Sequence, residues 1–442
     1  MMTESANDLD QTHDPALRSW VDAANDENGD FPIQNLPIAV FRRAGSGEQF
    51  RAGIAIGDSL VDLSASCLSP HLSEPGRAAL KLASSSRLNE FMAAGRPAQR
   101  ALRKDLSRML RHDFPEKKSV AEALVGLREV EFKMPARIGD FSDFYCSIHH
   151  ATNVGKLFRP ENPILPNYRW LPVGYQGRTS SILLSEQSIV RPKGQILPPG
   201  SAEPVYSDCR RLDYEAELGV FVGAGSALGA PISIDRIEDH LFGVCLLNDW
   251  SARDIQSWEY QPLGPFLAKS FATSISPWIV SFDALEPYRR PHRRPDGDPA
   301  PLPHLTSSTD AKRGAIDIKV SIDLLSATMR ARGLSPVRLS LSNYADAYWT
   351  IAQVVAHQTS NGCNLAPGDL IGTGTISGPS PQSRGCLLEL SEGGRSPVSL
   401  PSGEARVFLE DGDTVILRAW CEAKGRVRIG FGECRTTIGN AV

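Results

Sequence analysis

Two acids, a tyrosine and two adjacent histidines lie together in one short segment of the chain. The segment covers residues 140–155 and reads D-F-S-D-F-Y-C-S-I-H-H-A-T-N-V-G. A carboxylate near an imidazole suits metal-assisted proton transfer, because the carboxylate can anchor a hard cation while the imidazole takes a proton near neutral pH. A polar surface loop is the simpler interpretation of this segment alone. The positions of the other acids in the chain are therefore needed to choose between a metal-assisted site and a surface loop.

A second group of acids lies in a segment with strand periodicity. Within residues 212–223, Glu215 and Glu217 are two positions apart, so both carboxylates point to the same face of a strand. A polar strand face turned to water is the alternative for these two. Asp249, which ends an apolar strand, and Asp143 in the first segment favour a shared site. Four converging carboxylates repel one another unless a cation such as Ca²⁺ or Mg²⁺ lies between them.

His150 is the best candidate for a general base, because an imidazole titrates near physiological pH. The adjacent His149 is the alternative, and a structural role for a single histidine is the simpler one. An acid that binds the far ring nitrogen would fix the tautomer and raise the basicity. Glu389 lies in the apolar run L-L-E-L, which predicts a strand with a buried carboxylate in need of such a partner. An ion pair with an arginine is the other interpretation of Glu389.

Hydrogen-bond donors gather in residues 253–269, which read R-D-I-Q-S-W-E-Y-Q-P-L-G-P-F-L-A-K. Three of them could stabilise an oxyanion, and two tyrosines could bind carboxylate or carbonyl oxygens. These candidates are Arg253, Gln256 and Lys269 for the oxyanion, with Tyr260 and Tyr145 for the oxygens. Ordinary surface hydrogen bonding is the alternative for all five.

The glycines around Thr375, in G-T-G-T-I-S-G, predict close approach of the backbone to a ligand, although the lysine and spacing of a phosphate loop are missing. The chain has no G-x-S-x-G motif, and Cys146 lacks the setting of a nucleophilic thiol. The sequence therefore favours a metal-assisted mechanism that uses water over a covalent one.

The elements that must carry these residues are mostly strands. Residues 37–64 predict the short strands of a small antiparallel barrel, and residues 97–111 predict an amphipathic helix with a basic face. From residue 134 onward strands dominate, and residues 342–358 predict a long helix. Two further segments are predicted to be irregular: a poorly ordered start over residues 1–30, with Trp20 filling a groove, and a long surface loop over residues 287–312.

Composition excludes several classes of protein. The 442 residues are 41% hydrophobic and 22% charged, as in a globular protein, and the net charge of -4 gives no reason to expect nucleic acid or membranes as partners. The basic face of the predicted helix is most simply solvated. Eight cysteines without a C-x-x-C pair indicate reduced thiols, and the polar N-terminus shows no secretory signal. We expect a soluble intracellular protein.

Several long, ordered blocks of the chain carry a family resemblance. They are D-F-Y-x-S-x-x-H-A-T-N-V-G, L-P-V-G-Y-x-G-R, R-L-D-x-E-x-E-L, N-D-W-S-A-R-D-I-Q-x-W-E-Y-x-P-L-G-P-F-L-x-K-S, G-D-L-I-G-T-G-T-I-S-G and the N-terminal D-F-P-I-Q-N-L-P-I-A-V-F. These blocks resemble the fumarylacetoacetate hydrolase family. The resemblance extends from about His13 to the C-terminus. Departures occur in the first dozen residues, at Ile148-His149 and in the arginine-rich loop after Pro287.

The resemblance implies a mainly β protein with some α. A small N-terminal antiparallel β-barrel domain with a helical extension would occupy residues 1–133, and a large catalytic domain, a mixed β-sandwich roll, residues 134–442. It also implies roles for individual residues. The Ca²⁺ or Mg²⁺ ligands would be Asp143, Glu215, Glu217 and Asp249, with Asp249, Lys269 and Thr273 around a second, structural Mg²⁺. The base would be His150, oriented by Glu389. The oxyanion donors would be Arg253, Gln256 and Lys269. The substrate-binding residues would be Tyr145, Arg159, Tyr175, Gln256, Tyr260 and Thr375.

The reaction implied by the resemblance is metal-dependent hydrolysis of a carbon–carbon bond in a small β-diketone, 4-fumarylacetoacetate, to fumarate and acetoacetate. In the family this is the last step of tyrosine and phenylalanine catabolism, in a cytoplasmic homodimer. An acylpyruvate hydrolase or an oxaloacetate-type decarboxylase of the same superfamily is the alternative among enzymes. A calcium-binding structural protein is the alternative outside enzymes, but it would have no use for His150 paired with Glu389.

Overall fold

The computed structural model describes residues 9–439 of the chain. Its first sheet is antiparallel, with the strand order β4-β3-β2-β1-β5. The strands are β1 (Ile38–Arg43), β2 (Arg51–Ile56), β3 (Ser59–Asp62), β4 (Leu124–Gly126) and β5 (Val130–Lys133). The turn between β2 and β3 contains Gly57 at φ 59°, a left-handed conformation that glycine adopts without strain. The strands expected over residues 37–64 are confirmed, and they form a curled sheet with β4 and β5 at its edges.

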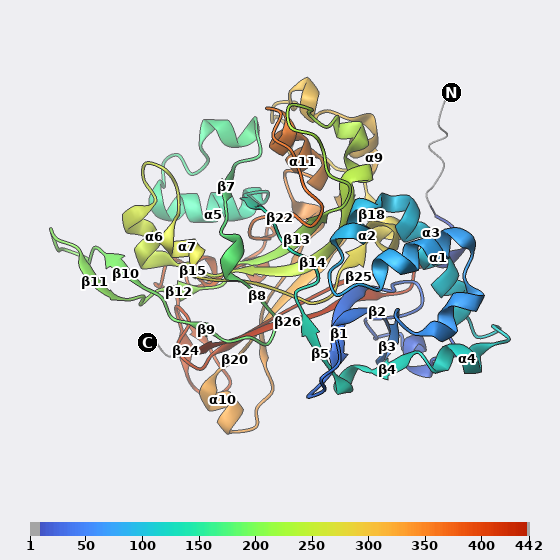
Figure 1. The fold of residues 1–442 in the computed structure, drawn as a ribbon. Helices are drawn as coiled ribbons and strands as arrows, with labels where there is room; N and C mark the ends of the chain where they lie inside the picture. The colour runs from blue at the N-terminus through green and yellow to red at the C-terminus, as the bar shows by residue number, and fades with distance from the viewer. Residues whose placement is uncertain (1–8, 440–442) are drawn as a thin grey trace.

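Helices cover this sheet on one side (Figure 1). They are α1 (Glu74–Ala83), α2 (Asn89–Ala93), α3 (Gly95–Leu110) and α4 (Lys117–Ala121). The predicted helix of residues 97–111 is α3, but its basic face is not simply solvated. Arg103 is buried and donates to the carbonyl oxygens of Gln34 and Asn35, while Arg100 pairs with Asp283. These arginines attach the helix to distant parts of the chain.

The expectation of poor order at the start of the chain is wrong for residues 9–30. This segment forms two short 3-10 helices, η1 (Gln11–His13) and η2 (Asp22–Asn25). Trp20 packs beside α3 and donates its indole N–H to the carbonyl oxygen of Met109 at 2.9 Å, in agreement with the expected groove. Contacts of this kind supply the order that a polar sequence does not suggest. Residues 1–8 lie outside the described range.

The second sheet is mixed and has eight strands, in the order β7-β6-β22-β13-β14-β16-β8 with β17 paired to β14. Its strands are β6 (Phe141–Phe144), β7 (Gly174–Gln176), β8 (Ile182–Leu184), β13 (Ala216–Val222), β14 (Leu241–Asp249), β16 (Thr273–Ile275), β17 (Val280–Ser281) and β22 (Leu370–Gly372). Strand β14 is buried along its whole length, as its apolar sequence predicts. Strand β6 pairs in parallel with β22, which brings Asp143 opposite Gly372.

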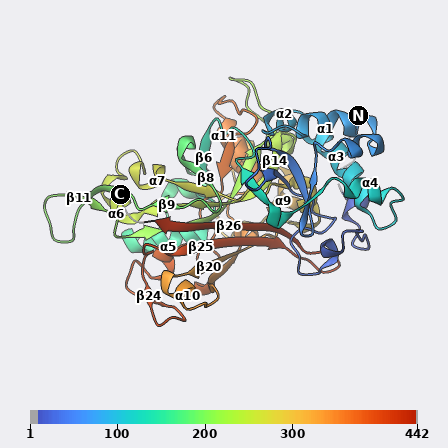
Figure 2. The same ribbon diagram turned by 60° about the horizontal axis from the view of Figure 1, so that its bottom comes forward.

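A third sheet has five strands in the order β21-β20-β25-β26-β9. They are β9 (Ile189–Val190), β20 (Lys319–Leu325), β21 (Val337–Asn343), β25 (Thr414–Cys421) and β26 (Ile429–Gly439). The closing pair of strands expected around Lys424 is confirmed by β25 and β26. Figure 2 shows β20, β25 and β26 side by side, in a layer apart from β8 and β14. Apolar side chains of both sheets fill the space between the layers, among them Val220, Val244, Leu246, Val320, Ile322 and Leu417.

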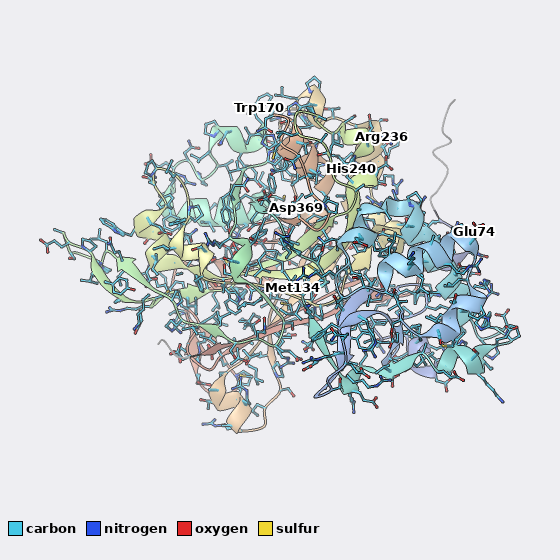
Figure 3. The ribbon with its side chains drawn as sticks, in the orientation of Figure 1. Glu74, Met134, Trp170, Arg236, His240 and Asp369 are labelled. Atoms are coloured by element: carbon cyan, nitrogen blue, oxygen red, sulfur yellow. The ribbon has the colours of Figure 1, made fainter. Side chains whose placement is uncertain are left out.

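A second hydrophobic cluster joins the N-terminal sheet and helices to the eight-stranded sheet. The rings of Phe91 and Phe242 meet edge to face with centroids 5.6 Å apart, and Ile38 and Phe221 belong to the same cluster. Met134 and Asp369 lie in the middle of the molecule, near this junction, whereas Glu74 lies on the outer helices (Figure 3). The expected mainly β protein with some α is confirmed.

Short elements complete the chain. The strands are β10 (Lys193–Ile196), β11 (Val205–Asp208), β12 (Leu212–Asp213), β15 (Ser251–Ala252), β18 (Arg289–Arg290), β19 (Ala315–Ile316), β23 (Val398–Ser399) and β24 (Ala405–Arg406). The helices are α5 (Ile148–Phe158), α6 (Arg253–Glu259), α7 (Leu267–Ser270), α8 (Phe282–Leu285), α9 (Ser308–Arg313), α10 (Ala327–Ala331), α11 (Ile351–Thr359) and α12 (Leu387–Leu390). Within residues 9–439 no helix is long and apolar enough to cross a membrane.

Three predicted elements differ from the structure. The helix expected over residues 342–358 begins only at Ile351, because Thr350 and Gln353 form a capping box there and the preceding residues leave β21 through a 3-10 turn. The loop expected over residues 287–312 contains β18 and most of α9. The run L-L-E-L is the helix α12 and not a strand.

Candidate active site

Three acids meet at one end of the eight-stranded sheet. Asp143 lies on β6, Glu217 near the start of β13, and Asp249 at the end of β14. All three side chains are buried, and one carboxylate oxygen from each lies within 4.8 Å of the others. Strand β22 lies between β6 and β13, and β14 pairs with β13, so the sheet register brings the three acids together. We call Asp143, Glu217 and Asp249 the acid triad.

Two members of the acid triad share one backbone donor. The N–H of Gly374 donates to Asp143 Oδ1 at 3.1 Å and to Glu217 Oε2 at 3.0 Å. Gly374 has φ 74°, and a Cβ atom there would lie 2.1 Å from the carbonyl oxygen of Phe144, so only glycine fits. Glu217 Oε1 is buried without a hydrogen-bond partner. One oxygen of the acid triad therefore remains available to a ligand.

Burial raises the pKa of each carboxyl in the acid triad. The charge of Asp249 raises the pKa of Asp143 further, and the charges of Asp143 and Asp249 do the same for Glu217. For Asp249 the ammonium of Lys269 opposes the rise without cancelling it. Crowded, desolvated carboxylates with a free oxygen are the donor set that Ca²⁺ and Mg²⁺ prefer, so these residues fit a divalent cation.

Glu215 lies beside the acid triad and is paired with two cationic side chains. Arg253 Nη1 lies 2.8 Å from Glu215 Oε1, and Lys269 Nζ binds Glu215 Oε2 and also Asp249 Oδ2, the latter at 2.7 Å. Burial opposes ionisation of Glu215, but Lys269 and Arg253 outweigh it and lower its pKa. The two acids raise the pKa of Lys269 despite its burial, so its ammonium has no lone pair for a metal. Thr273 Oγ1 lies 3.3 Å from Asp249 Oδ1, to which it donates.

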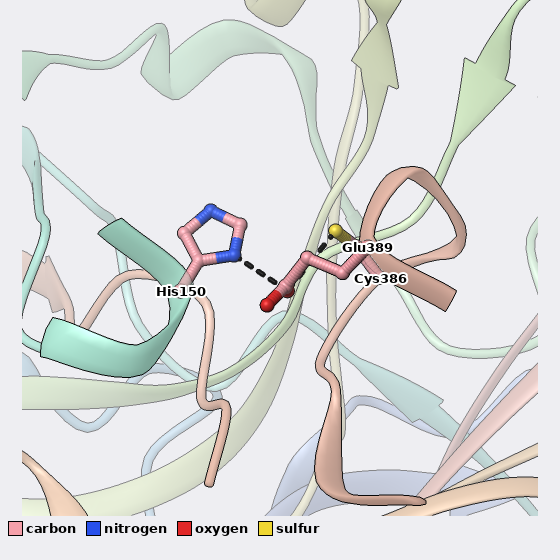
Figure 4. A group of neighbouring side chains, drawn as sticks. All are labelled: His150, Cys386 and Glu389. Carbon is pink, nitrogen blue, oxygen red and sulfur yellow. Dashed lines mark hydrogen bonds and ion pairs between the residues drawn. The ribbon is translucent and has the colours of Figure 1, made fainter. Parts of the chain in front are cut away.

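The predicted pair of His150 and Glu389 is present. His150 lies in the first turn of α5, where Ser147 caps the helix, and its Nδ1 is 2.6 Å from Glu389 Oε2 (Figure 4). The other ring nitrogen, Nε2, lies 3.9 Å from Glu215 Oε1 and so faces the acids. The neighbouring His149 is only partly buried. Burial raises the pKa of the Asp346 carboxyl, and the His149 imidazole lies close enough to oppose this rise. The geometry favours His150 of the two histidines.

Glu389 is held by three further donors that sequence reasoning missed. Asn153 Nδ2 donates to Oε1 at 2.8 Å, Ser377 Oγ donates to Oε2 at 2.8 Å, and the Cys386 thiol lies 3.3 Å from Oε2 (Figure 4). Burial opposes ionisation, but His150 and then these hydrogen bonds lower the pKa of Glu389 to about 2. The role of Asn153 could have been predicted from the sequence, because Asn153 follows His150 by three positions and so lies on the same helix face.

Several predicted substrate-binding residues border the acids. Tyr175 donates its hydroxyl to Asp249 Oδ2 at 2.8 Å, and the ring of Tyr145 meets His150 edge to face with centroids 5.1 Å apart. Gln256 Oε1 accepts a hydrogen bond from Arg253 Nη1 at 3.2 Å. Thr375 directly follows Gly374, and its hydroxyl is buried without a partner. A second unpaired polar atom therefore lies on the residue that follows the shared donor of the acid triad.

Arg159 and Tyr260 lie at helix ends. Arg159 follows α5, and its Nη2 is 3.4 Å from the carbonyl oxygen of Pro163. Tyr260 follows α6, and its hydroxyl accepts from Gln261 Nε2 at 3.0 Å. Among residues 9–439 no hydrogen bond or ion pair is recorded between either side chain and the acid triad. Contacts among the described residues therefore join the other predicted site residues to one another, whereas Arg159 and Tyr260 bond to near neighbours in the chain and the hydroxyl of Thr375 has no partner.

Two family models match the chain. The model described as fumarylacetoacetate (FAA) hydrolase C-terminal covers residues 141–439, and the model described as fumarylacetoacetase N-terminal covers residues 34–135. The fumarylacetoacetase of Arabidopsis thaliana is 46% identical over 96% of this chain and 98% of its own length. The fumarylacetoacetase of Homo sapiens is 44% identical over 92% of this chain and 96% of its own length.

A solved fumarylacetoacetate hydrolase from Exiguobacterium antarcticum is 16% identical, with a TM-score of 0.49 over 92% of this chain and 99% of that chain. The family assignment rests on the sequence relatives and the family models, which extend over all three large sheets and all the acids described above. On that basis the chain belongs to the fumarylacetoacetate hydrolase family.

Proposed function

We propose that this protein hydrolyses the carbon–carbon bond of 4-fumarylacetoacetate, giving fumarate and acetoacetate as the last step of tyrosine and phenylalanine catabolism. The observation that carries the proposal is the buried acid triad, with an unpaired oxygen on Glu217, next to the His150–Glu389 pair. A site that holds a hard cation beside a base suits hydrolysis of a β-diketone. The relatives that are named fumarylacetoacetase support the choice of substrate.

Asp143, Glu217 and Asp249 are the proposed ligands of a Ca²⁺ or Mg²⁺ ion, with Glu215 as a fourth ligand. Their burial and the raised pKa values of the acid triad support this assignment. When bound, the divalent ion supplies Lewis acidity to the two diketone oxygens and neutralises the charge that develops on them. A second, structural Mg²⁺ near Asp249, Lys269 and Thr273 belongs to the same proposal, but protonated Lys269 Nζ is not a ligand.

His150 acts as the general base. Glu389 binds Nδ1 and fixes the tautomer, so Nε2 is free to take a proton from water. The water oxygen bonds to the carbonyl carbon of the fumaryl group. The carbon–carbon bond then breaks, and its electron pair leaves with acetoacetate as an enolate. The proton on His150 Nε2 passes to the enolate carbon, which restores the base.

The cationic and polar side chains around Glu215 stabilise the oxyanion of the tetrahedral intermediate. The donors are Arg253, Gln256 and Lys269, and the first two are hydrogen-bonded to each other. The remaining polar groups bind the substrate. They are Tyr145, Arg159, Tyr175, Tyr260 and Thr375, with Gln256 serving both purposes. The unpaired hydroxyl of Thr375 supports this role, because a buried polar group needs a partner.

The protein is proposed to act as a cytoplasmic homodimer, with domains at residues 1–133 and 134–442. The end of β5 at Lys133 supports the domain boundary. An exposed apolar patch supports the dimer, since single chains seldom leave such patches open. The apolar patch comprises Val205, Tyr206, Trp258, Leu263, Phe266 and Leu267. Val205 and Tyr206 lie on β11, and the other four residues lie on α6, α7 and their connection. Strand β10 pairs with β11 and contacts α6, so these elements are neighbours (Figure 1). A second copy of the chain is its proposed occupant.

The first experiment follows the absorbance of enzymatically prepared fumarylacetoacetate with the purified protein, before and after EDTA. We expect loss of the diketone band that stops with EDTA and returns with added Mg²⁺ or Ca²⁺, because the acid triad needs a cation. Fumarate and acetoacetate should appear in equal amounts. Turnover of acylpyruvates or oxaloacetate without turnover of fumarylacetoacetate would assign the protein to another reaction of the superfamily.

Replacing the base should remove hydrolysis without unfolding the site. For His150→Ala we expect kcat to fall by about 100-fold or more, as for other general bases, while Ca²⁺ affinity changes little. The melting temperature should fall but the variant should stay folded, because Glu389 keeps its other hydrogen bonds. His149→Ala is the matched control, because it removes the adjacent imidazole from the same helix, and it should keep most of the activity. An active His150→Ala variant would exclude His150 as the base.

Glu217→Gln tests the acid triad. The substitution preserves the shape of the side chain but removes its negative charge, so we expect Ca²⁺ affinity in a calorimetric titration to fall by about tenfold or more. Glu433→Gln, a change in a surface ion-pair network of the five-stranded sheet, should leave the affinity unchanged. Equal affinities for Glu217→Gln and the unmodified protein would remove Glu217 from the ligand set.

Leu263→Asp tests the dimer. Leu263 is 97% exposed in the single chain, so the substitution should leave the fold intact while placing a charge in the proposed interface. Light scattering after size-exclusion chromatography should give the mass of two chains for the unmodified protein and a shift toward one chain for the variant. Leu228→Asp, at an 81% exposed site outside the apolar patch, should remain dimeric. A monomeric unmodified protein would contradict this part of the proposal.

A further inference from the structure

Asp213 is a buried acid that neither the proposed metal site nor the proposed chemistry uses. Its side chain lies on β12 and has no exposed surface. Its two oxygens accept hydrogen bonds from the Nε of Arg253 at 2.9 Å and from the backbone N–H groups of Tyr214, Leu387 and Leu388 at 2.9, 2.8 and 3.0 Å. One carboxylate thus connects segments that lie about 170 residues apart in the chain.

The first connection fixes the guanidinium of Arg253. Its Nε donates to Asp213 Oδ2, and its Nη2 lies 2.8 Å from the same oxygen. Because a guanidinium is planar, this contact sets the direction of the remaining nitrogen, Nη1, which lies 2.8 Å from Glu215 Oε1. Asp213 therefore determines how Arg253 faces the acids.

The second connection fixes the start of α12. This helix has only four residues, and its N-cap residue, Cys386, makes no side-chain capping bond. Asp213 takes that place from a distant strand, since it accepts the N–H groups of Leu387 and Leu388, which no carbonyl within the helix can reach. Glu389, the next residue of α12, holds the Nδ1 of His150.

We propose that Asp213 is a positioning residue that aligns the oxyanion donor Arg253 and the His150–Glu389 pair with a single carboxylate. The inference rests on the proposed hydrolysis, in which both groups act on the same tetrahedral intermediate. Because one carboxylate binds Arg253 and also caps α12, it holds the oxyanion donor and the base in a fixed relation to each other. Asp213 itself touches neither the acid triad nor a proposed substrate-binding residue.

Asp213→Asn separates positioning from bulk stability. The amide has the size of the carboxylate but offers one acceptor oxygen, so its NH₂ must face either Arg253 or a backbone N–H group. We expect kcat for fumarylacetoacetate to fall by about 10-fold to 100-fold. The KM should stay within about threefold, because Arg253 and His150 act mainly in the transition state. Calorimetric Ca²⁺ affinity should also be retained, since the acid triad is untouched.

Asp413→Asn is the matched control. Asp413 is also fully buried, accepts hydrogen bonds from Nε and Nη2 of Arg406 at 2.9 and 3.1 Å, and accepts the backbone N–H of Glu410 at 2.9 Å. This control removes the carboxylate partner of a buried arginine that lies outside the candidate site. It should lower the melting temperature while leaving kcat and KM unchanged. If both variants lower kcat equally, Asp213 has only a structural role.

A double variant covers the case in which Asp213→Asn alone does not fold. Asp213→Asn with Arg253→Gln removes both charges together, so no arginine is left buried without its partner. Its kcat should be lower than that of Arg253→Gln alone, because the start of α12 is also released. Equal kcat values would overturn the connection to α12. If the unmodified protein is active and Asp213→Asn keeps its full kcat, this inference alone is overturned. If the unmodified protein is inactive, the proposed function is overturned.

Discussion

The removal of carboxylates from water is the constraint on which the site depends. A buried charge costs several kcal/mol unless hydrogen bonds and opposite charges surround it. Glu215 meets this requirement through Arg253 and Lys269, and Glu389 through His150 and three further donors. The acid triad meets it only in part, and Glu217 Oε1 has no partner. Because the neighbouring acids are paired, the uncompensated negative charge is concentrated at one point of the fold, where a cation stabilises it best.

Strand periodicity made much of this arrangement predictable. Glu215 and Glu217 are two residues apart in a strand-like segment, and Asp249 ends an apolar run, so their approach could be expected from side-chain alternation. The pairing of His150 with Glu389 was expected from the family resemblance, since the chemistry of the two residues alone left an arginine as another possible partner of Glu389. The helical conformation of Glu389 was not predicted, because four residues are too few to distinguish the two periodicities.

Other features depend on contacts that a sequence does not reveal. Tyr344, Tyr348, Ile351 and Val355 recur at helical spacing, which suggested one helix over residues 342–358, yet a capping box at Thr350 starts the helix later. The bonds of Ser377 to Glu389 and of Asp213 to α12 join segments whose neighbours are decided only by the packed sheets. Asp213 stands in the same alternating pattern as Glu215 and shares Arg253 with it, but Asp213 also accepts backbone N–H groups of α12, which the pattern does not reveal.

The hydrogen bond from Gly374 to Asp143 spans 231 positions of the chain, and the parallel pairing of β6 with β22 lies next to it. Parallel strands need long connections, and such distant contacts form late because a large loop must close first. During synthesis the ribosome must release residue 374 before the two acids can share their donor. The shared donor of Asp143 and Glu217 is therefore added only after all three acids of the triad have left the ribosome, so the complete arrangement marks a late stage of synthesis.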